Sequence, residues 1–194
     1  MKLIIASNNK NKIYEIKKIL GDKFEQILSQ REAGIEHETV EDGNTFLENA
    51  RKKAREIAEI SGCAALADDS GICVHALGGE PGIYSARYSG GHGNDLDNNN
   101  LVLKNLKDKQ DKTAHYTCAV ALVYPDGREL SAEGYMYGEI TENSRGDRGF
   151  GYDPIFVPEG ESRTVAQMTD EEKNAISHRA NALRLLLSKI ASEN

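Results

Sequence analysis

The hydrophobic pattern at the start of the chain predicts a strand, a polar turn and a helix. Residues 3–6 form a short apolar run of the kind that buried strands contain. Polar residues 7–9 interrupt this run. Apolar residues then recur at helical spacing as far as Gly21, at Ile13, Ile16, Ile19 and Leu20.

Two capping boxes predict the starts of two further helices. Thr45 with Glu48 precedes an apolar stripe that Gly62 ends, and Thr169 with Glu172 precedes another that continues to Ile190. In such a box each side chain accepts a hydrogen bond from the backbone N–H of the other residue, so the pair marks a helix start. A further helix is expected over residues 97–106.

The remaining apolar runs predict strands. Residues 64–67 and 72–76 are expected to flank a turn at residues 68–71, and a glycine-rich loop is expected over residues 78–93. Residues 114–124 and 129–140 read as a long hairpin around a Pro-Asp-Gly turn, and residues 154–157 as a short strand. Helices and strands alternate early and a hairpin follows, so we predict a mixed α/β sheet with helical flanks, in one domain over residues 1–194.

Composition and charge restrict the partners. The 194-residue chain has a net charge of −7, whereas a duplex-binding protein normally presents a basic face. An acidic protein can hold a polyanion only in a local basic pocket or through a metal, which favours small phosphorylated ligands over nucleic acid. Three scattered cysteines indicate no disulfide framework, and no apolar run is long enough for a membrane span or a signal peptide. We therefore expect a cytoplasmic protein with no membrane partner.

The polar turn after the first strand has the features of an anion-binding loop. Unpaired N–H groups and the positive end of a helix dipole favour a phosphate at such a place. The turn consists of Ser7, Asn8, Asn9, Lys10, Asn11 and Lys12. It lacks the glycines of a Walker A loop. The same residues would also suit a capped helix with solvated lysines.

Three carboxylates form a candidate magnesium site. Asp68 and Asp69 are adjacent, which is unfavourable unless a positive charge compensates them, and Glu41 lies in another turn signal. Mg²⁺ takes oxygen ligands and is often held by one or two carboxylates together with substrate phosphates. Consecutive strand residues point to opposite faces, so only one aspartate is expected to face the metal and the attacking water. The pattern alone leaves open which one.

Two segments near the C-terminus are candidates for recognising a flat base. The glycines around an aromatic residue at positions 149–152 allow close backbone approach, and Phe150 or Tyr152 can stack on a base. Lys173, His178 and Arg179 supply donors that suit the carbonyl edge of a purine. A packed loop and a charged helix start are the structural alternatives. Zinc-type histidine spacing, a G-x-S-x-G elbow and a Rossmann fingerprint are all absent from the sequence.

Taken together, these motifs resemble the inosine/xanthosine triphosphate pyrophosphatase family. The resemblance runs almost end to end, through residues 6–12, 41–54, 67–71, 79–88, 97–100, 149–156 and 177–179. It implies a mixed α/β fold with an elongated sheet, two lobes around a central cleft, and a homodimer. The implied activity is magnesium-dependent hydrolysis of non-standard purine nucleoside triphosphates (ITP, dITP, XTP and dXTP) to the monophosphate and pyrophosphate.

The resemblance also assigns roles to residues. The loop from Ser7 to Lys12 would hold the triphosphate, Glu41 and Asp69 the metal, and Asp69 would be the catalytic base. Asp68 would be a supporting carboxylate, Lys53 would contact the phosphates in the catalytic group, and Ser70 would contact the substrate. The base pocket would comprise Phe150, Gly151, Tyr152, Asp153, Lys173, His178 and Arg179. One departure is Asp147, which stands where the family often has glycine, and it affects the expected shape of the loop.

Three other functions are compatible with parts of the sequence. A Maf-like nucleotide pyrophosphatase would have a different base preference. A nucleotide sensor would bind without hydrolysis, although the intact carboxylates disfavour it. A nucleic-acid-binding protein would use the lysine-rich helices, against the net negative charge.

Overall fold

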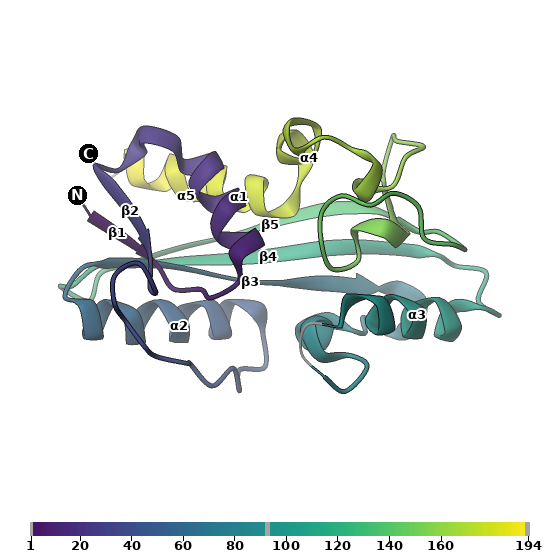
Figure 1. The fold of residues 1–194 in the computed structure, drawn as a ribbon, viewed down its shortest axis with the longest axis horizontal. Coiled ribbons are helices and arrows are strands. Elements are labelled where there is room, and N and C mark those ends of the chain that lie inside the picture. Colours follow the sequence, from purple (N-terminus) through teal and green to yellow (C-terminus); the bar gives the residue numbers. More distant parts are fainter. Residues whose placement is uncertain (1, 92–93, 193–194) are drawn as a thin grey trace. The chain divides into compact units, whose positions relative to one another are not determined.

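The computed structural model describes residues 2–91 and 94–192, and it has the mixed α/β architecture that the pattern predicts (Figure 1). Residues 92 and 93, at the end of the expected glycine-rich loop, lie outside the described residues. The helices are α1 (Lys10–Leu20), α2 (Phe46–Ser61), α3 (Asp95–Leu106), α4 (Asp170–Ile176) and α5 (His178–Ser192). The strands are β1 (Lys2–Ile5), β2 (Gln26–Ser29), β3 (Ala64–Val74), β4 (Thr113–Val123), β5 (Glu129–Ile140) and β6 (Phe156–Pro158).

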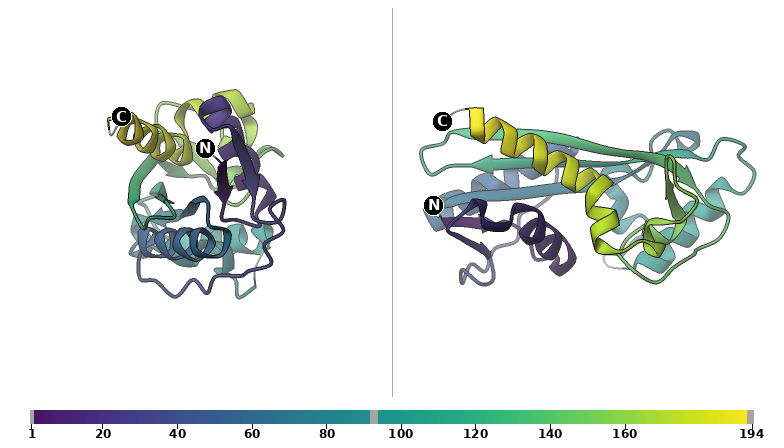
Figure 2. Two further views of the ribbon diagram at one scale, coloured as in Figure 1. Left: turned by 90° about the vertical axis from the view of Figure 1, so that its left-hand side faces the viewer. Right: turned by 90° about the horizontal axis from the view of Figure 1, so that it is seen from above.

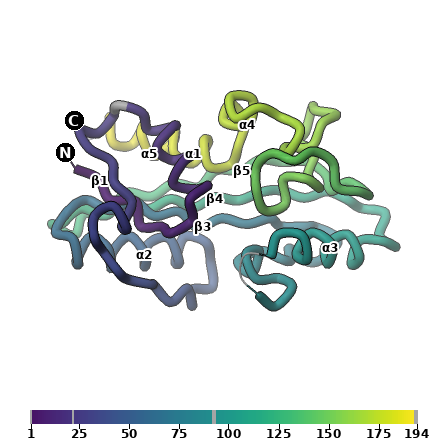
Figure 3. The backbone as a smooth tube through the Cα atoms, in the orientation of Figure 1, coloured from purple at the N-terminus to yellow at the C-terminus, as the bar shows by residue number. Residues whose placement is uncertain are grey.

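The strands form one mixed sheet in the order β2-β1-β3-β4-β5-β6. β1 pairs in parallel with both β2 and β3, and the tube in Figure 3 shows β1 beside β2. β5 pairs antiparallel with β6. None of the helices in the described ranges is long and apolar enough to cross a membrane.

The chain divides into two compact units. Unit 1 comprises the described residues of Met1–Asp69, Cys118–Gly134 and Arg179–Asn194. In it α2 covers one face of the strands and α1 and α5 cover the other (Figures 1 and 2). Ile16 and Leu20 of α1 pack with Leu183 and Leu186 of α5 in one buried cluster. This packing attaches the polar turn before α1 to a rigid core.

Unit 2 comprises the described residues of Ser70–Thr117 and Tyr135–His178. Figure 1 shows α3 on one face of its strands, with α4 and the segment before it on the other. Its core includes Val102 of α3, Tyr116 of β4 and Phe156 of β6. Each unit therefore has a hydrophobic cluster of its own.

The predicted helix starts are confirmed by their caps. The Thr45 hydroxyl accepts from the Glu48 N–H, and Gly62 ends α2 in the left-handed conformation at φ 62°. Thr169 and Glu172 form both bonds of a capping box at α4. The single helix expected after Thr169 is wrong, however. Ser177 is extended at ψ 149°, so the chain forms α4 and α5 in place of one helix.

The predicted turn at residues 68–71 is also wrong, because β3 runs through it without interruption. Gly71 is needed for a close approach. A Cβ there would lie 2.4 Å from both the Gly82 oxygen and the Ser85 Oγ, and the Ile72 N–H donates to that Oγ at 2.9 Å. A serine–glycine pair usually signals a turn, but here the glycine lets a loop pack against a strand.

Candidate functional site

Because β3 is continuous, Asp68 and Asp69 point to opposite faces of the strand. Both side chains are buried, with 0% of the Asp68 side chain and 9% of the Asp69 side chain exposed. Their surroundings in unit 1 are different. The two aspartates therefore have different direct partners, although Lys12 and Lys53 act on the pKa of both.

Asp68 is held by two cations. Its Oδ2 accepts from Arg179 Nη2 at 2.9 Å and lies 3.2 Å from Lys12 Nζ. Arg179, whose side chain is 1% exposed, also donates to Glu15. Burial by itself would raise the pKa of the Asp68 carboxyl, but Lys12 and Arg179 outweigh it and lower that pKa below its usual range. Asp68 is thus fixed in its ionised form.

Asp69 lies in a group with less positive charge. Asn49 Nδ2 donates to its Oδ2 at 3.0 Å, and Lys53 Nζ lies 3.6 Å from its Oδ1. Lys53 also donates to Glu41 at 2.6 Å, so one ammonium serves two carboxylates. Burial, with a contribution from Glu41, raises the pKa of Asp69 despite the nearby lysines. Of the two aspartates, Asp69 is therefore the one prepared to accept a proton.

Lys53 stays charged in this group. Burial alone would lower the pKa of its ammonium, but Asp69 and Glu41 outweigh it and the net shift is upward. Glu41 and Asp69 supply the hard oxygen donors that Mg²⁺ prefers, and one lysine does not neutralise both. Within residues 2–91 and 94–192 no three or more His, Cys, Asp or Glu residues gather to form a metal cage. Glu41 and Asp69 fit a cation of the kind that one or two carboxylates hold together with phosphate oxygens and water.

The structure gives the polar turn before α1 a clear capping pattern. Asn9 Oδ1 accepts from the Asn11 N–H at 3.0 Å and from the Lys12 N–H at 3.2 Å. Ser7 Oγ accepts from the Asn9 N–H at 3.2 Å. Two of the N–H groups that suggested an anion site are thus already capped, and Lys12 is directed to Asp68. Asn8, Asn9, Lys10 and Asn11 remain exposed.

In unit 2, Asp153 organises the aromatic loop. One carboxylate oxygen, Oδ2, accepts from the Phe150 N–H at 3.0 Å and from Lys173 Nζ at 2.7 Å. The other, Oδ1, accepts from the Tyr116 hydroxyl at 3.2 Å. The Lys173 ammonium lies 4.6 Å from the centre of the Phe150 ring, a cation–π distance. Gly149 at φ 74° permits this turn, because a Cβ would lie 2.1 Å from Asp153 Oδ2.

The structure separates two residues that the sequence grouped together. His178 belongs to unit 2 and stacks on Tyr116, with ring centres 4.5 Å apart and planes at 7°. Its neighbour Arg179 belongs to unit 1 and holds Asp68 and Glu15. The prediction that Arg179 reads a base stays a prediction, and its guanidinium forms ion pairs with two buried carboxylates.

Sequence reasoning missed several residues of these groups. Glu15 lies in α1, and Tyr116 lies in an apolar stretch of β4, where it reads as core. Asp95 and Asn99 of α3 hold Gly151, whose N–H donates to Asp95 at 2.7 Å and whose oxygen accepts from Asn99 at 3.1 Å. No local sequence signal marks Asp95 or Asn99, because each of the two contacts a residue more than fifty positions away.

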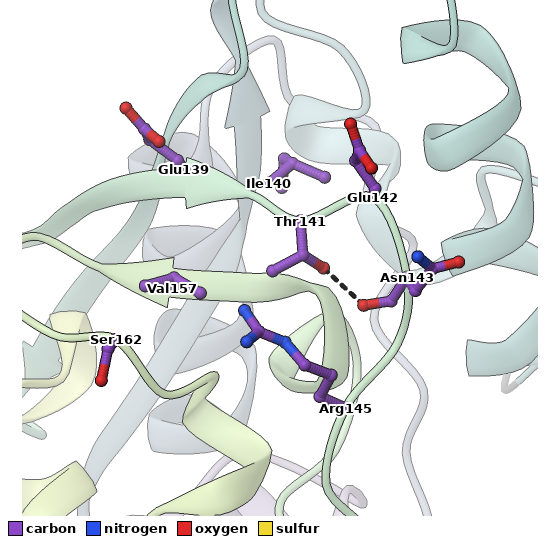
Figure 4. A pocket seen from close by; sticks show the side chains of 8 residues that line it. All are labelled: Glu139, Ile140, Thr141, Glu142, Asn143, Arg145, Val157 and Ser162. Carbon is purple, nitrogen blue, oxygen red and sulfur yellow. Dashed lines mark hydrogen bonds between the residues drawn. The ribbon is translucent and has the colours of Figure 1, made fainter.

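A hollow of about 500 Å³ lies elsewhere on unit 2, near the end of β5 (Figure 4). It is lined by Glu139, Ile140, Thr141, Glu142, Asn143, Arg145, Val157 and Ser162. None of the expected site residues lines it. The buried charged groups, and not this hollow, are the candidate site.

Fold and site together define an α/β protein whose buried carboxylates are paired with lysine and arginine. A model of the Ham1 family matches residues 3–189, so the chain belongs to the Ham1 family. A relative from Clostridium perfringens, named dITP/XTP pyrophosphatase, is 49% identical over 193 residues and aligns over 95% of each chain. A relative of the same name from Streptomyces avermitilis is 46% identical, over 96% of this chain and 95% of its own.

Solved structures of the family have the same fold. The Ham1 protein of Staphylococcus aureus has a TM-score of 0.89 at 38% identity and covers all of both chains. The HAM1 protein of Coxiella burnetii has a TM-score of 0.89 at 39% identity, again over all of both chains. The family resemblance and the fold class that the motifs indicate are thereby confirmed.

Proposed function

We propose that this chain hydrolyses non-standard purine nucleoside triphosphates, namely ITP, XTP and their deoxy forms, to the nucleoside monophosphate and pyrophosphate. The observation that carries the proposal is the difference between the two adjacent aspartates. Asp68 is held ionised by two cations, whereas burial raises the pKa of Asp69. The names of the relatives support the same reaction.

In this reaction a water attacks the α-phosphorus and pyrophosphate leaves, and one proton is released from the water. Asp69 accepts this proton, a contribution of about 10²- to 10⁴-fold to the rate. Lys53, which bridges Glu41 and Asp69, stabilises negative charge on the phosphates. Asp68 stays ionised and keeps Lys12 in place.

Glu41 and Asp69 are the residues that would hold Mg²⁺. Bound there, the ion supplies positive charge that neutralises the phosphate oxygens during hydrolysis. The loop of Ser7, Asn8, Asn9, Lys10, Asn11 and Lys12 contributes exposed polar groups for the triphosphate, and Ser70 a further substrate contact. Removal of the metal with a chelator is expected to abolish turnover.

Recognition of the base is assigned to unit 2. The Phe150 ring offers a stacking surface, and Lys173 and His178 offer donors to the 6-keto oxygen of hypoxanthine or xanthine. Adenine has an amino group at that position and leaves these donors mispaired, which a site built on hydrogen bonds rejects strongly. Gly151, Tyr152 and Asp153 complete the set in unit 2, and Arg179 of unit 1 is proposed as a further base contact. We further propose that the enzyme is a cytoplasmic homodimer.

The test is pyrophosphate release from ITP, XTP, dITP, GTP, ATP and pyrimidine triphosphates, with and without Mg²⁺. We expect release to be fastest from ITP and XTP and to require the metal. Release from none of them would favour a nucleotide sensor. Fastest release from a pyrimidine triphosphate would favour a Maf-like preference.

A further inference from the structure

Tyr116 occupies the centre of the unit 2 group without belonging to any of its motifs. It lies in β4, is 6% exposed, and stacks face to face on His178 with ring centres 4.5 Å apart and planes at 7°. The Phe156 ring meets it edge-on at 5.0 Å. A parallel stack between two buried rings fixes the plane of the imidazole, because any tilt would break contact across the whole ring face.

The hydroxyl of Tyr116 orients a second group, the carboxylate of Asp153. It donates to Asp153 Oδ1 at 3.2 Å, and the other oxygen of this carboxylate accepts from Lys173 and from the Phe150 N–H. Burial and the nearby Asp153 raise the pKa of the Tyr116 phenol well above its usual value. The group therefore remains a protonated donor throughout the physiological range.

We propose that Tyr116 is a positioning residue that sets base preference, because its ring orients His178 and its hydroxyl orients the Asp153 carboxylate that holds Lys173 and Phe150. This inference rests on the proposed function. Tyr116 acts through these neighbours and is not itself the group that reads the base. A 1 Å displacement of such donors is enough to weaken discrimination substantially.

Two substitutions separate the two contacts. Tyr116→Phe keeps the stack and removes the hydrogen bond to Asp153. Tyr116→Leu removes both. A hydrogen bond to a charged carboxylate contributes about 1.5–3 kcal/mol. At 3.2 Å the bond to Asp153 is expected at the lower end, so Tyr116→Phe should reduce the ITP-over-ATP ratio of kcat/KM by roughly 10-fold. An aromatic pair contributes about 0.5–1.5 kcal/mol, so Tyr116→Leu is expected to reduce the ratio by roughly a further 2- to 12-fold.

Tyr88→Phe is the matched control. The Tyr88 hydroxyl also donates to a carboxylate of unit 2, that of Glu80 at 2.8 Å, and it accepts from Asn105 Nδ2 at 3.0 Å. Neither of these two partners belongs to the proposed base-reading set. We expect this variant to keep the wild-type ITP-over-ATP ratio. A purely structural role for Tyr116 would lower kcat for every nucleotide alike and leave the ratio unchanged.

The experiment measures kcat and KM for ITP, XTP and ATP in the full chain and the three variants, with melting temperatures alongside. A falling ratio in folded Tyr116→Phe and Tyr116→Leu, with Tyr88→Phe unchanged, supports the proposal. Wild-type ratios in both Tyr116 variants overturn it and leave the proposed function intact. A wild-type enzyme that releases no pyrophosphate from ITP or XTP overturns both.

Discussion

Replacing Arg179 by methionine should be among the most destabilising single substitutions in unit 1. The local charges balance, since Arg179 and Lys12 are positive and Asp68 and Glu15 are negative. Methionine is of similar length, so the change removes the charge while filling the space. It removes the arginine from two buried carboxylates, those of Glu15 and Asp68. Breaking a buried pair from one side costs about 3–5 kcal/mol, because the remaining charge is still out of water and has lost the attraction of its partner.

A double-mutant cycle tests this reasoning. Glu15→Gln alone removes one charged hydrogen bond, for a loss of about 1.5–3 kcal/mol. The double variant Glu15→Gln/Arg179→Met removes the Glu15 charge together with its arginine partner. We therefore expect it to be more stable than the sum of the single losses predicts, by at least about 1 kcal/mol.

The assay is urea unfolding at neutral pH, with the free energy of unfolding extrapolated to water and the m-value checked for constancy. Arg163→Met is the control, because Arg163 pairs with Glu172 at 3.0 Å but its side chain is 41% exposed. An exposed pair is expected to contribute no more than about 1 kcal/mol. A loss below about 1 kcal/mol for Arg179→Met, or additivity of the cycle within about 0.5 kcal/mol, would refute the argument.

Three further outcomes are expected. Asp69→Asn should reduce turnover by at least about 10²-fold, and unchanged hydrolysis would place the base elsewhere. The same variant should not lower the melting temperature at pH 7, because a raised pKa of Asp69 means that its ionised carboxylate destabilises the fold at that pH. Gly149→Ala should lower the free energy of unfolding by more than Gly151→Ala, since both have positive φ but only at position 149 would the Cβ collide with Asp153; equal losses in urea titrations would contradict this. Hydrogen bonds, led by the one from Lys17, lower the pKa of Glu32 to about 2 from 4.5, so the stabilisation that Glu32 provides is present above pH 4.5 and is lost as the pH falls toward 2. Glu32→Gln should therefore flatten the dependence of the free energy of unfolding on pH in this window, and a pH curve parallel to that of the wild type would exclude the effect.

Local features of the fold could be predicted because their causes are local. Thr45 and Glu48 are three positions apart, and the capping bond between them needs only the chain between them. The apolar stripes of α1, α2 and α5 follow from helical periodicity in the same way. The prediction failed where a serine–glycine pair had two possible meanings. Gly71 serves a close approach of Ser85, which lies fourteen positions further along the chain.

The candidate site divides along the same line. Its residue types are written in the sequence, since adjacent aspartates, a lysine-bearing turn and a glycine–aromatic loop all stand as local motifs. The residues that give these motifs their distinct properties are not marked by any local motif. Tyr116 reads as one more apolar residue of a strand, and only the fold brings it to Asp153, 37 positions away.

The sequence by itself determined the class of fold, the capped starts of α2 and α4, and the family, because short-range periodicity, capping and motif order carry that information. Only the tertiary structure decided that β3 runs unbroken through Asp68 and Asp69, and which of the two carboxyl groups has its pKa lowered and which has it raised. The cause is long-range. Arg179 reaches Glu15 across 164 positions and Asp68 across 111, and a buried charge takes its pKa from the groups that surround it in space.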